Sequence, residues 1–162
     1  MAEKTILQKI VERGHYKFVD RVESWQEGVK LSCESLAATG YVSPDYYKQI
    51  VDCIEKYGPY VVFDHYVAMP HSQEGAEGAE KTAVGFMRVK EDVDFGKDED
   101  GEQKIARLFF TLAAKDPNEH LDNMQQLMTI FTNEPLLDAL MEANTPEDIL
   151  KAEADFPPEE DF

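Results

Sequence analysis

Basic residues are scarce in this chain of 162 residues, which has 16 Lys and Arg against 33 Asp and Glu and a formal net charge of −17. Proteins that bind nucleic acid or an anionic membrane surface need a basic footprint, so this deficit argues strongly against both kinds of partner. It is compatible with a protein partner that has a basic docking face. Acidity also keeps a protein soluble, and that commoner explanation stays open.

Cysteine is rare as well, and long apolar runs are missing. Cys33 and Cys53 do not make a disulfide framework; each falls on an apolar stripe at helical spacing, so both are predicted to be buried packing residues. No apolar run approaches the length that spans a membrane. The N-terminus lacks a basic segment followed by an apolar stretch, so no secretion signal is visible and a cytoplasmic protein is expected. The length fits one soluble domain.

One short motif stands out, because Ala68-Met69-Pro70-His71 follows the strand-like run at 60–63. Pro70 fixes its own φ and pushes Met69 towards an extended conformation, so His71 is predicted to point outwards beyond the strand. A neutral imidazole is nucleophilic near pH 7 and can attack phosphorus or carry a proton. Taken alone, however, the motif favours an ordinary surface histidine after a turn.

Helix and strand signals predict the surrounding elements. Ser24 and Glu27 form a capping-box pattern, and Pro44 and Asp45 are typical of a helix start. The expected helices lie at 3–12, 24–38, 43–57, 116–131, 135–142 and 146–152, and the expected strands at 16–22, 60–64, 82–90 and 105–113. Strands that alternate with helical pairs predict a single α/β domain over residues 1–153, with a mixed β-sheet flanked by helices. An acidic loop is expected at 96–102, and residues 154–162 are predicted to be an acidic, disordered tail.

The helix that starts at Asp116 has its own pattern. Pro117 in the first turn and Glu119 three residues after Asp116 are start signals. A stripe at helical spacing is predicted to face the core, and it consists of Leu121, Met124, Met128 and Phe131. His120 lies in the first turn, one position off that stripe. His15, near the N-terminus, is predicted to be a surface residue.

Several segments occur in an order that resembles the mannitol/fructose class of enzyme IIA domains of the bacterial phosphoenolpyruvate-dependent sugar phosphotransferase system, most of all its ascorbate-type (SgaA-like) branch. The resemblance extends from about Ser24 to Phe131 and covers most of the chain. It is carried by Gly58-Pro59-Tyr60-Val61-Val62, Val67-Ala68-Met69-Pro70-His71, Thr82-Ala83-Val84-Gly85-Phe86, Val93-Asp94-Phe95-Gly96, Leu112-Ala113-Ala114-Lys115-Asp116 and Asn118-Glu119-His120-Leu121.

The resemblance implies a phosphotransferase that carries a phosphoryl group on a histidine. His71 matches the residue that accepts phosphate from phospho-HPr and passes it to a cysteine of an enzyme IIB, which works with a membrane enzyme IIC. His120 matches a second histidine that stabilises the phosphoryl group. No cofactor and no metal are expected, and the transported compound is expected to be a sugar or an ascorbate-like sugar acid.

Some family features are missing, and two alternatives stay open. Ser72–Gly75 lacks the Arg often found there in ascorbate-type members, and Tyr47–Gln49 lacks the active-site Arg of mannitol-type members. His65 stands near a position where the family tends to have Pro-Gly, and a structural role is favoured for it.

The first alternative function is a regulatory module that receives phosphate without feeding transport. The second, weaker one is a metal-dependent hydrolase that uses His65, His71, Glu74 and His120. The oligomeric state is not predicted.

Overall fold

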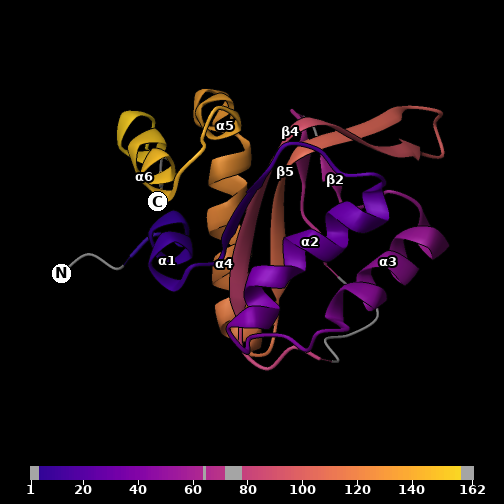
Figure 1. Cartoon of the computed structure of the whole chain (residues 1–162), viewed down its shortest axis with the longest axis horizontal. Helices are drawn as coiled ribbons and strands as arrows, with labels where there is room; N and C mark the ends of the chain where they lie inside the picture. Colours follow the sequence, from indigo (N-terminus) through magenta and orange to yellow (C-terminus); the bar gives the residue numbers. More distant parts are fainter. Residues whose placement is uncertain (1–3, 64, 72–77, 158–162) are drawn as a thin grey trace.

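A mixed sheet with the strand order β1-β4-β5-β3-β2 carries helices on both faces (Figure 1). The computed structural model describes residues 4–63, 65–71 and 78–157. The strands are β1 (Tyr16–Val19), β2 (Val62–Phe63), β3 (Val67–Ala68), β4 (Ala83–Lys97) and β5 (Gln103–Ala113). The helices are α1 (Ile6–Arg13), α2 (Trp25–Ala38), α3 (Tyr46–Tyr57), α4 (Pro117–Phe131), α5 (Glu134–Met141) and α6 (Pro146–Asp155). The predicted α/β class with a mixed, helix-flanked sheet is confirmed.

The core has two layers because the central strands are buried on both faces. Phe109 of β5 packs with α2 and α3 on one side, whereas its neighbours Leu108 and Phe110 pack with α1, α4, α5 and α6 on the other. This alternation is the two-residue period of a strand, and it explains why β5 reads as an almost continuous apolar run. β5 pairs with β4 in antiparallel and with β3 in parallel, and β1 pairs with β4 in parallel.

The local signals place most helix starts correctly and miss details that depend on tertiary contacts. Ser24 accepts a hydrogen bond from the Glu27 amide at 3.1 Å, but the Glu27 carboxylate accepts from the Glu23 amide instead of closing the capping box. α3 begins only at Tyr46. β4 extends to Lys97, which shortens the predicted acidic loop to residues 98–102. β3 was not predicted, because two residues are too few to show a period.

Half of the predicted buried stripe on α4 is wrong. Leu121 and Met128 are 57% and 41% exposed, and the α4 residues buried against the sheet are instead Asn123, Leu127 and Ile130. The helix has two apolar stripes about one residue, or roughly 100°, apart, and periodicity alone does not choose between them. The buried stripe is the one that contains Asn123 and Leu127. His120 lies on the same side of α4 as these residues, towards the sheet.

The prediction for His15 is also wrong, because this residue is buried with 1% of its surface exposed. Its Nε2 lies 2.9 Å from the Thr39 hydroxyl, and its ring meets the Tyr41 ring edge-on at 4.5 Å. Burial, assisted by the positive charge of Arg13, lowers the pKa of His15 from 6.5 to about 4. His15 is therefore neutral at pH 7 and belongs to the packed interior.

We expect His15 to make folding sensitive to mild acid. Unfolded His15 takes up its proton near pH 6.5 and the folded residue only near pH 4, so the unfolded state binds more protons between these values. The free energy of unfolding should therefore fall as pH drops from about 6.5 to about 4, by roughly 3 kcal/mol from this group. Urea unfolding of the wild type and of His15→Gln over this range measures the difference in slope. Parallel pH profiles for the two proteins would contradict the assignment.

Both cysteines are buried, as predicted, and the pKa of the Cys33 thiol is raised by burial to about 12, so it is an inert packing group.

At the other end of the chain, α6 continues to Asp155, and the Asn133 amide donates to the backbone carbonyls of Phe156 and Pro157. The remainder of the predicted tail, 158–162, lies outside the described residues. None of the described helices combines the length and apolar character needed to cross a membrane.

Candidate functional site

The segment that carries His71 is fixed by backbone hydrogen bonds at the end of β3. The Met69 amide donates to the Val61 carbonyl at 2.8 Å, and the Leu112 amide at the end of β5 donates to the Pro70 carbonyl at 3.0 Å. Met69 and Pro70 are both buried, so the turn is clamped between two neighbouring strands. His71 itself is half-buried. The predicted position just beyond a strand is confirmed, with a ring less exposed than an outward-pointing surface residue would be.

The hydrogen bonding of the His71 ring determines which nitrogen is reactive. Nδ1 lies 2.6 Å from the Met69 carbonyl oxygen. A carbonyl only accepts, so Nδ1 carries the proton and Nε2 keeps its lone pair. The Tyr60 ring stands edge-on to the His71 ring at 5.1 Å, and the Tyr60 hydroxyl donates to the His71 carbonyl. Ring and backbone are therefore both held, and Nε2 is the free nucleophilic atom.

The electrostatic surroundings keep the His71 ring neutral. Burial lowers its pKa below 6.5, the hydrogen bond to the Met69 carbonyl opposes that shift, and the charge of His120 lowers the pKa further. A neutral imidazole at pH 7 is the form that attacks an electrophile. His120 acts on His71 electrostatically, although 49 positions separate the two histidines in the sequence.

His120 is positioned by a well-capped first turn of α4. The Thr82 hydroxyl accepts hydrogen bonds from the Lys115 and Asp116 amides at 2.8 and 2.6 Å, which fixes the turn from β5 into α4. Asp116 then caps the helix, because its carboxylate accepts from the Asn118 amide at 3.0 Å. Nδ1 of His120 is buried and has no hydrogen-bond partner within the described residues. A buried polar nitrogen left unpaired is costly, and a ligand atom is one way to satisfy it.

Two features of the histidines are of the kind that bind a phosphoryl group. His71 offers a nucleophilic nitrogen, and His120 offers an unpaired ring nitrogen from the start of a helix, where the helix dipole favours negative charge. Phosphoryl transfer proceeds through a loose transition state, so positioning and charge stabilisation are the main contributions a protein makes. Among the described residues, the held ring of His71 and the unpaired nitrogen of His120 are features suited to these two contributions.

The side chain of His65 is held by residues of helix α5. Its Nε2 lies 2.7 Å from the Asp138 carboxylate and its Nδ1 lies 3.9 Å from the Glu134 carboxylate, so the ring is engaged by α5. His65 and Tyr66 both have left-handed backbone conformations, with φ of 63° and 65°. Glycine adopts this conformation most easily, so the bonds to α5 help to hold an unfavourable turn. The structural role favoured for His65 agrees with this placement.

Three residues of the ligand set of the metal-dependent alternative, His65, His71 and His120, are among the described residues. Within the described ranges, no three His, Cys, Asp or Glu side chains lie close enough together to hold one metal ion. His65 contacts Asp138 on α5, whereas the charge of His120 acts on His71. Glu74 lies outside the described residues, as do the positions 72–75 at which the family often has Arg.

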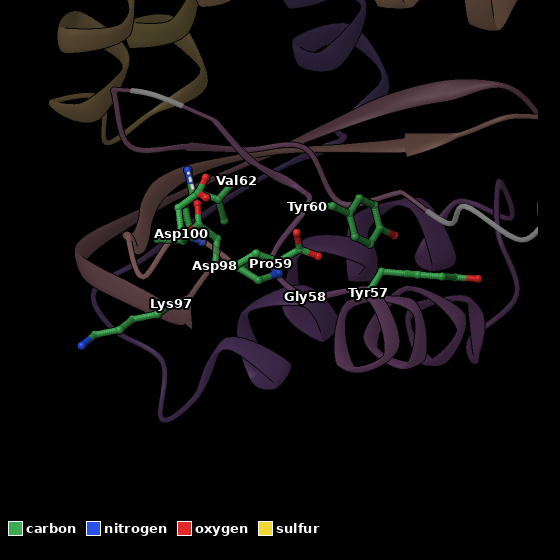
Figure 2. A pocket seen from close by; sticks show the side chains of 10 residues that line it. Tyr57, Gly58, Pro59, Tyr60, Val62, Lys97, Asp98 and Asp100 are labelled. Carbon is green, nitrogen blue, oxygen red and sulfur yellow. Dashed lines mark hydrogen bonds and ion pairs between the residues drawn. The ribbon is translucent and has the colours of Figure 1, made fainter.

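A cavity of about 600 Å³ lies beside this site, between the end of α3 and the tip of the β4–β5 hairpin (Figure 2). Tyr60 lines it and also contacts His71, but neither histidine is among its lining residues. Asp98 and Asp100 come from the hairpin and give this cavity acidic groups, with Lys97 and Lys104 beside them. The three lining carboxylates, Asp98, Glu99 and Asp100, outnumber the two lining lysines, so this cavity does not favour a dianionic ligand.

The sequence reasoning missed two residues that build the site. Tyr60 lies 11 positions before His71, and Thr82 lies more than 30 positions before the turn it supports. Both stand within segments that carry the family resemblance, but nothing in residue type or spacing marks them as supports. Their roles arise from contacts between segments distant in the sequence.

Comparison with known proteins identifies relatives along almost the whole chain. Residues 9–153 match the family model described as "Phosphoenolpyruvate-dependent sugar phosphotransferase system, EIIA 2". The chain is 32% identical over 142 residues to the ascorbate-specific phosphotransferase-system EIIA component of Escherichia coli strain K12, and the match covers 87% of this chain and 90% of that protein.

Two solved structures show the same fold. A phosphotransferase-system IIA protein (PtxA) from Streptococcus mutans superposes with a TM-score of 0.79 at 28% identity, covering 94% of both chains. Enzyme IIAMTL from Escherichia coli, in its complex with phosphorylated enzyme IIBMTL, superposes with a TM-score of 0.69 at 28% identity, covering 86% of this chain and 94% of that one.

Proposed function

Because the chain belongs to the EIIA 2 family of the phosphoenolpyruvate-dependent sugar phosphotransferase system, and is therefore a phosphoryl carrier, we propose that Nε2 of His71 is the atom that carries the phosphoryl group. The observation that supports this choice is the 2.6 Å hydrogen bond between Nδ1 and the Met69 carbonyl, which leaves Nε2 as the only ring nitrogen with a free lone pair. The lowered pKa of His71 keeps that lone pair available at pH 7.

The carrier reaction consists of two in-line transfers. In the first, the Nε2 lone pair of His71 forms a bond to phosphorus while the bond to the donor breaks, and its electron pair stays on the donor. In the second, a nucleophile of the acceptor forms the new bond to phosphorus and the electron pair of the N–P bond returns to Nε2. His120 donates a hydrogen bond to a phosphoryl oxygen in both steps, which stabilises charge in the transition state.

The proposed partners and transported compound are inferred from the relatives. Phospho-HPr is the proposed donor and a cysteine of an enzyme IIB the proposed acceptor, with a membrane enzyme IIC as the transport component. The structural relative from Escherichia coli forms a complex with phosphorylated enzyme IIBMTL, which supports the enzyme IIB partner. The ascorbate-specific relative supports an ascorbate-like sugar acid as the compound transported. We place the protein in the cytoplasm, where such a relay would operate.

Phosphorylation of the purified protein tests this proposal. Incubation with phosphoenolpyruvate, enzyme I and HPr is expected to add one phosphoryl group per chain, measured by intact mass, and acid should remove it because the phosphoramidate bond of phosphohistidine is acid-labile. Addition of the cognate enzyme IIB should return the mass to its starting value. Omitting HPr is the control.

Failure to gain mass with the cognate general components would contradict the proposal. A protein that gains the phosphoryl group but does not pass it to the cognate enzyme IIB would favour the regulatory alternative, which uses the same chemistry at His71 without the second transfer. The two half-reactions therefore separate the carrier from the regulatory module.

A further inference from the structure

Four basic side chains gather where α1, the start of β4 and the first turn of α4 meet. They are Lys9, Arg13, Lys81 and Lys115. None of the four has an ion pair with a described residue. Acidic residues are about twice as numerous as basic ones in this chain, so carboxylates that could pair with them are plentiful. A group of unpaired cations in so acidic a protein is a first indication of an anion site.

These cations line two adjoining cavities, which share Arg13, Thr82 and Glu119 as lining residues. The inner cavity has a volume of about 10 Å³, enough for one water-sized group. The outer cavity has a volume of about 340 Å³, within the range of small-molecule sites. Neither His71 nor His120 lines either cavity, so this place is separate from the two histidines of the relay.

The inner cavity contains two buried polar side chains with hydrogen-bonding capacity to spare. Asn123 of α4 lines it and is only 7% exposed, yet its amide makes no hydrogen bond to a described residue. Thr82 is 6% exposed, and its hydroxyl accepts from the Lys115 and Asp116 amides but donates its own proton to no described residue. A buried amide without a partner is costly, and a ligand oxygen in the inner cavity would satisfy it.

At the outer cavity, Tyr41 holds two of the cations in place. Lys81 Nζ lies 5.0 Å and the guanidinium carbon of Arg13 5.8 Å from the centroid of the Tyr41 ring. The ring is itself fixed, because it meets the buried His15 ring edge-on at 4.5 Å. A cation–π contact positions a cation without neutralising it, so the N–H groups stay available to a carboxylate or a phosphate.

Two carboxylates in the outer cavity restrict what it can bind. Asp116 is engaged at the helix start, where it accepts from the Asn118 amide, whereas Glu119 has no hydrogen bond or ion pair with a described residue. Four cations against two carboxylates leave the combined site positively charged. The free Glu119 carboxylate can accept from a hydroxyl group. The lining therefore favours a small hydroxylated anion over a bare, highly charged one.

We propose that this junction of α1, β4 and α4 binds a small anionic metabolite through a carboxylate or phosphate group. One oxygen of that group occupies the inner cavity and accepts hydrogen bonds from the Asn123 amide and the Thr82 hydroxyl. The remainder of the anion lies in the outer cavity, beside Arg13 and Lys81. The inference does not depend on the proposed function, because it uses neither histidine of the relay.

An NMR titration tests the proposal, with inorganic phosphate and malonate as the two probes and potassium chloride at matched ionic strength as the reference. The side-chain amide of Asn123 is a reporter inside the inner cavity. At least one probe should shift its resonances along a saturable one-site curve, and chloride should not. Saturation by phosphate alone assigns a phosphate ester, and saturation by malonate alone assigns a carboxylate. No saturable shift with either probe would overturn the proposal.

The double variant Arg13→Gln plus Lys81→Gln should raise the dissociation constant of the probe at least about tenfold, because each cation supplies charge-assisted hydrogen bonds. Arg21→Gln plus Lys30→Gln is the matched control. It removes the same two charges from exposed residues that line neither cavity, and it should leave the dissociation constant near its wild-type value. Equal weakening in both double variants would show general charge attraction only and would overturn the site.

Asn123→Leu separates binding from packing. Leucine has a similar volume and removes an amide that no described residue uses, so the variant should be at least as stable as the wild type in the absence of anion. Its dissociation constant for the probe, followed at the Thr82 backbone amide, should rise about tenfold or more. Thermal unfolding measures the stability. An unchanged dissociation constant would contradict the role of Asn123, whatever its effect on stability.

Discussion

His71→Ala is expected to abolish phosphoryl acceptance from phospho-HPr completely. The substitution removes Nε2, the nitrogen that the hydrogen bond between Nδ1 and the Met69 carbonyl leaves free. The turn should survive, because it is held by backbone bonds from Met69 and Leu112 that do not use the His71 side chain. Loss of the contact with the Tyr60 ring should cost only about 1 kcal/mol of stability. Intact mass after incubation with phosphoenolpyruvate, enzyme I and HPr is the measurement.

His65→Ala is the matched control for this experiment. His65 contacts Asp138 on α5, so its removal should leave phosphoryl acceptance at the wild-type level. Uptake that survives in His71→Ala and disappears in His65→Ala would reassign the acceptor to His65. Uptake that survives in both variants would move the acceptor to another residue altogether.

His120→Ala should leave His71 able to accept phosphate but slow the transfer. Nδ1 of His120 is buried without a partner among the described residues, and the charge of His120 lowers the pKa of His71, which supports a role for His120 beside the phosphoryl group that His71 is proposed to carry. Loss of a positioned donor to a developing charge typically costs about 100- to 1,000-fold in rate. Rapid-quench measurement of phosphorylation by phospho-HPr and of transfer to enzyme IIB gives both rates.

His120→Gln separates the donor role from a purely structural one. Glutamine keeps a hydrogen-bond donor of similar reach, so part of the lost rate should return. A histidine that acts only at a helix start should change stability by about 1 kcal/mol or less and leave both transfer rates unchanged. Wild-type rates in His120→Ala would therefore return His120 to a structural role.

The parts of the fold that local signals determine were predictable from the sequence. Ser24 and Asp116 cap helix starts through hydrogen bonds that span three residues or fewer, Pro117 needs no partner in the first turn, and each lies at the helix start it predicted. The long apolar run of β5 favoured a mostly buried central strand over a buried helix, which the pattern alone left open, and the structure has the strand. Strand β3 escaped prediction because two residues carry no period, and it takes its identity from pairing with β5.

Burial on α4 and around His15 was not predictable in the same way. Leu121 and Leu127 are equally apolar, and the sequence does not say which side of the helix meets the sheet. His15 looks polar in isolation and becomes a core residue only because Thr39 and Tyr41 surround it. In each case a tertiary contact, distant in sequence, decides between two locally acceptable arrangements.

The same distinction between local sequence signals and contacts distant in the sequence applies to the candidate site. Pro70 and the apolar residues before it predict that His71 lies just beyond a strand, but not that this strand is β3 or that Met69 and Pro70 are buried. The pairing of His71 with His120 came from the family resemblance, because no spacing rule connects residues 49 positions apart. Tyr60 and Thr82 were found only in the structure, where they hold the His71 carbonyl and the turn into α4.

The nitrogen that carries the phosphoryl group is the most direct test of the account. NMR of the phosphorylated protein, labelled with ¹⁵N in its histidines, distinguishes phosphorylation at Nε2 from phosphorylation at Nδ1 by the nitrogen that couples to phosphorus. The bond from Nδ1 to the Met69 carbonyl predicts a single phosphohistidine, at Nε2 of His71. A phosphoryl group on Nδ1 of His71, or on any other histidine, would contradict it.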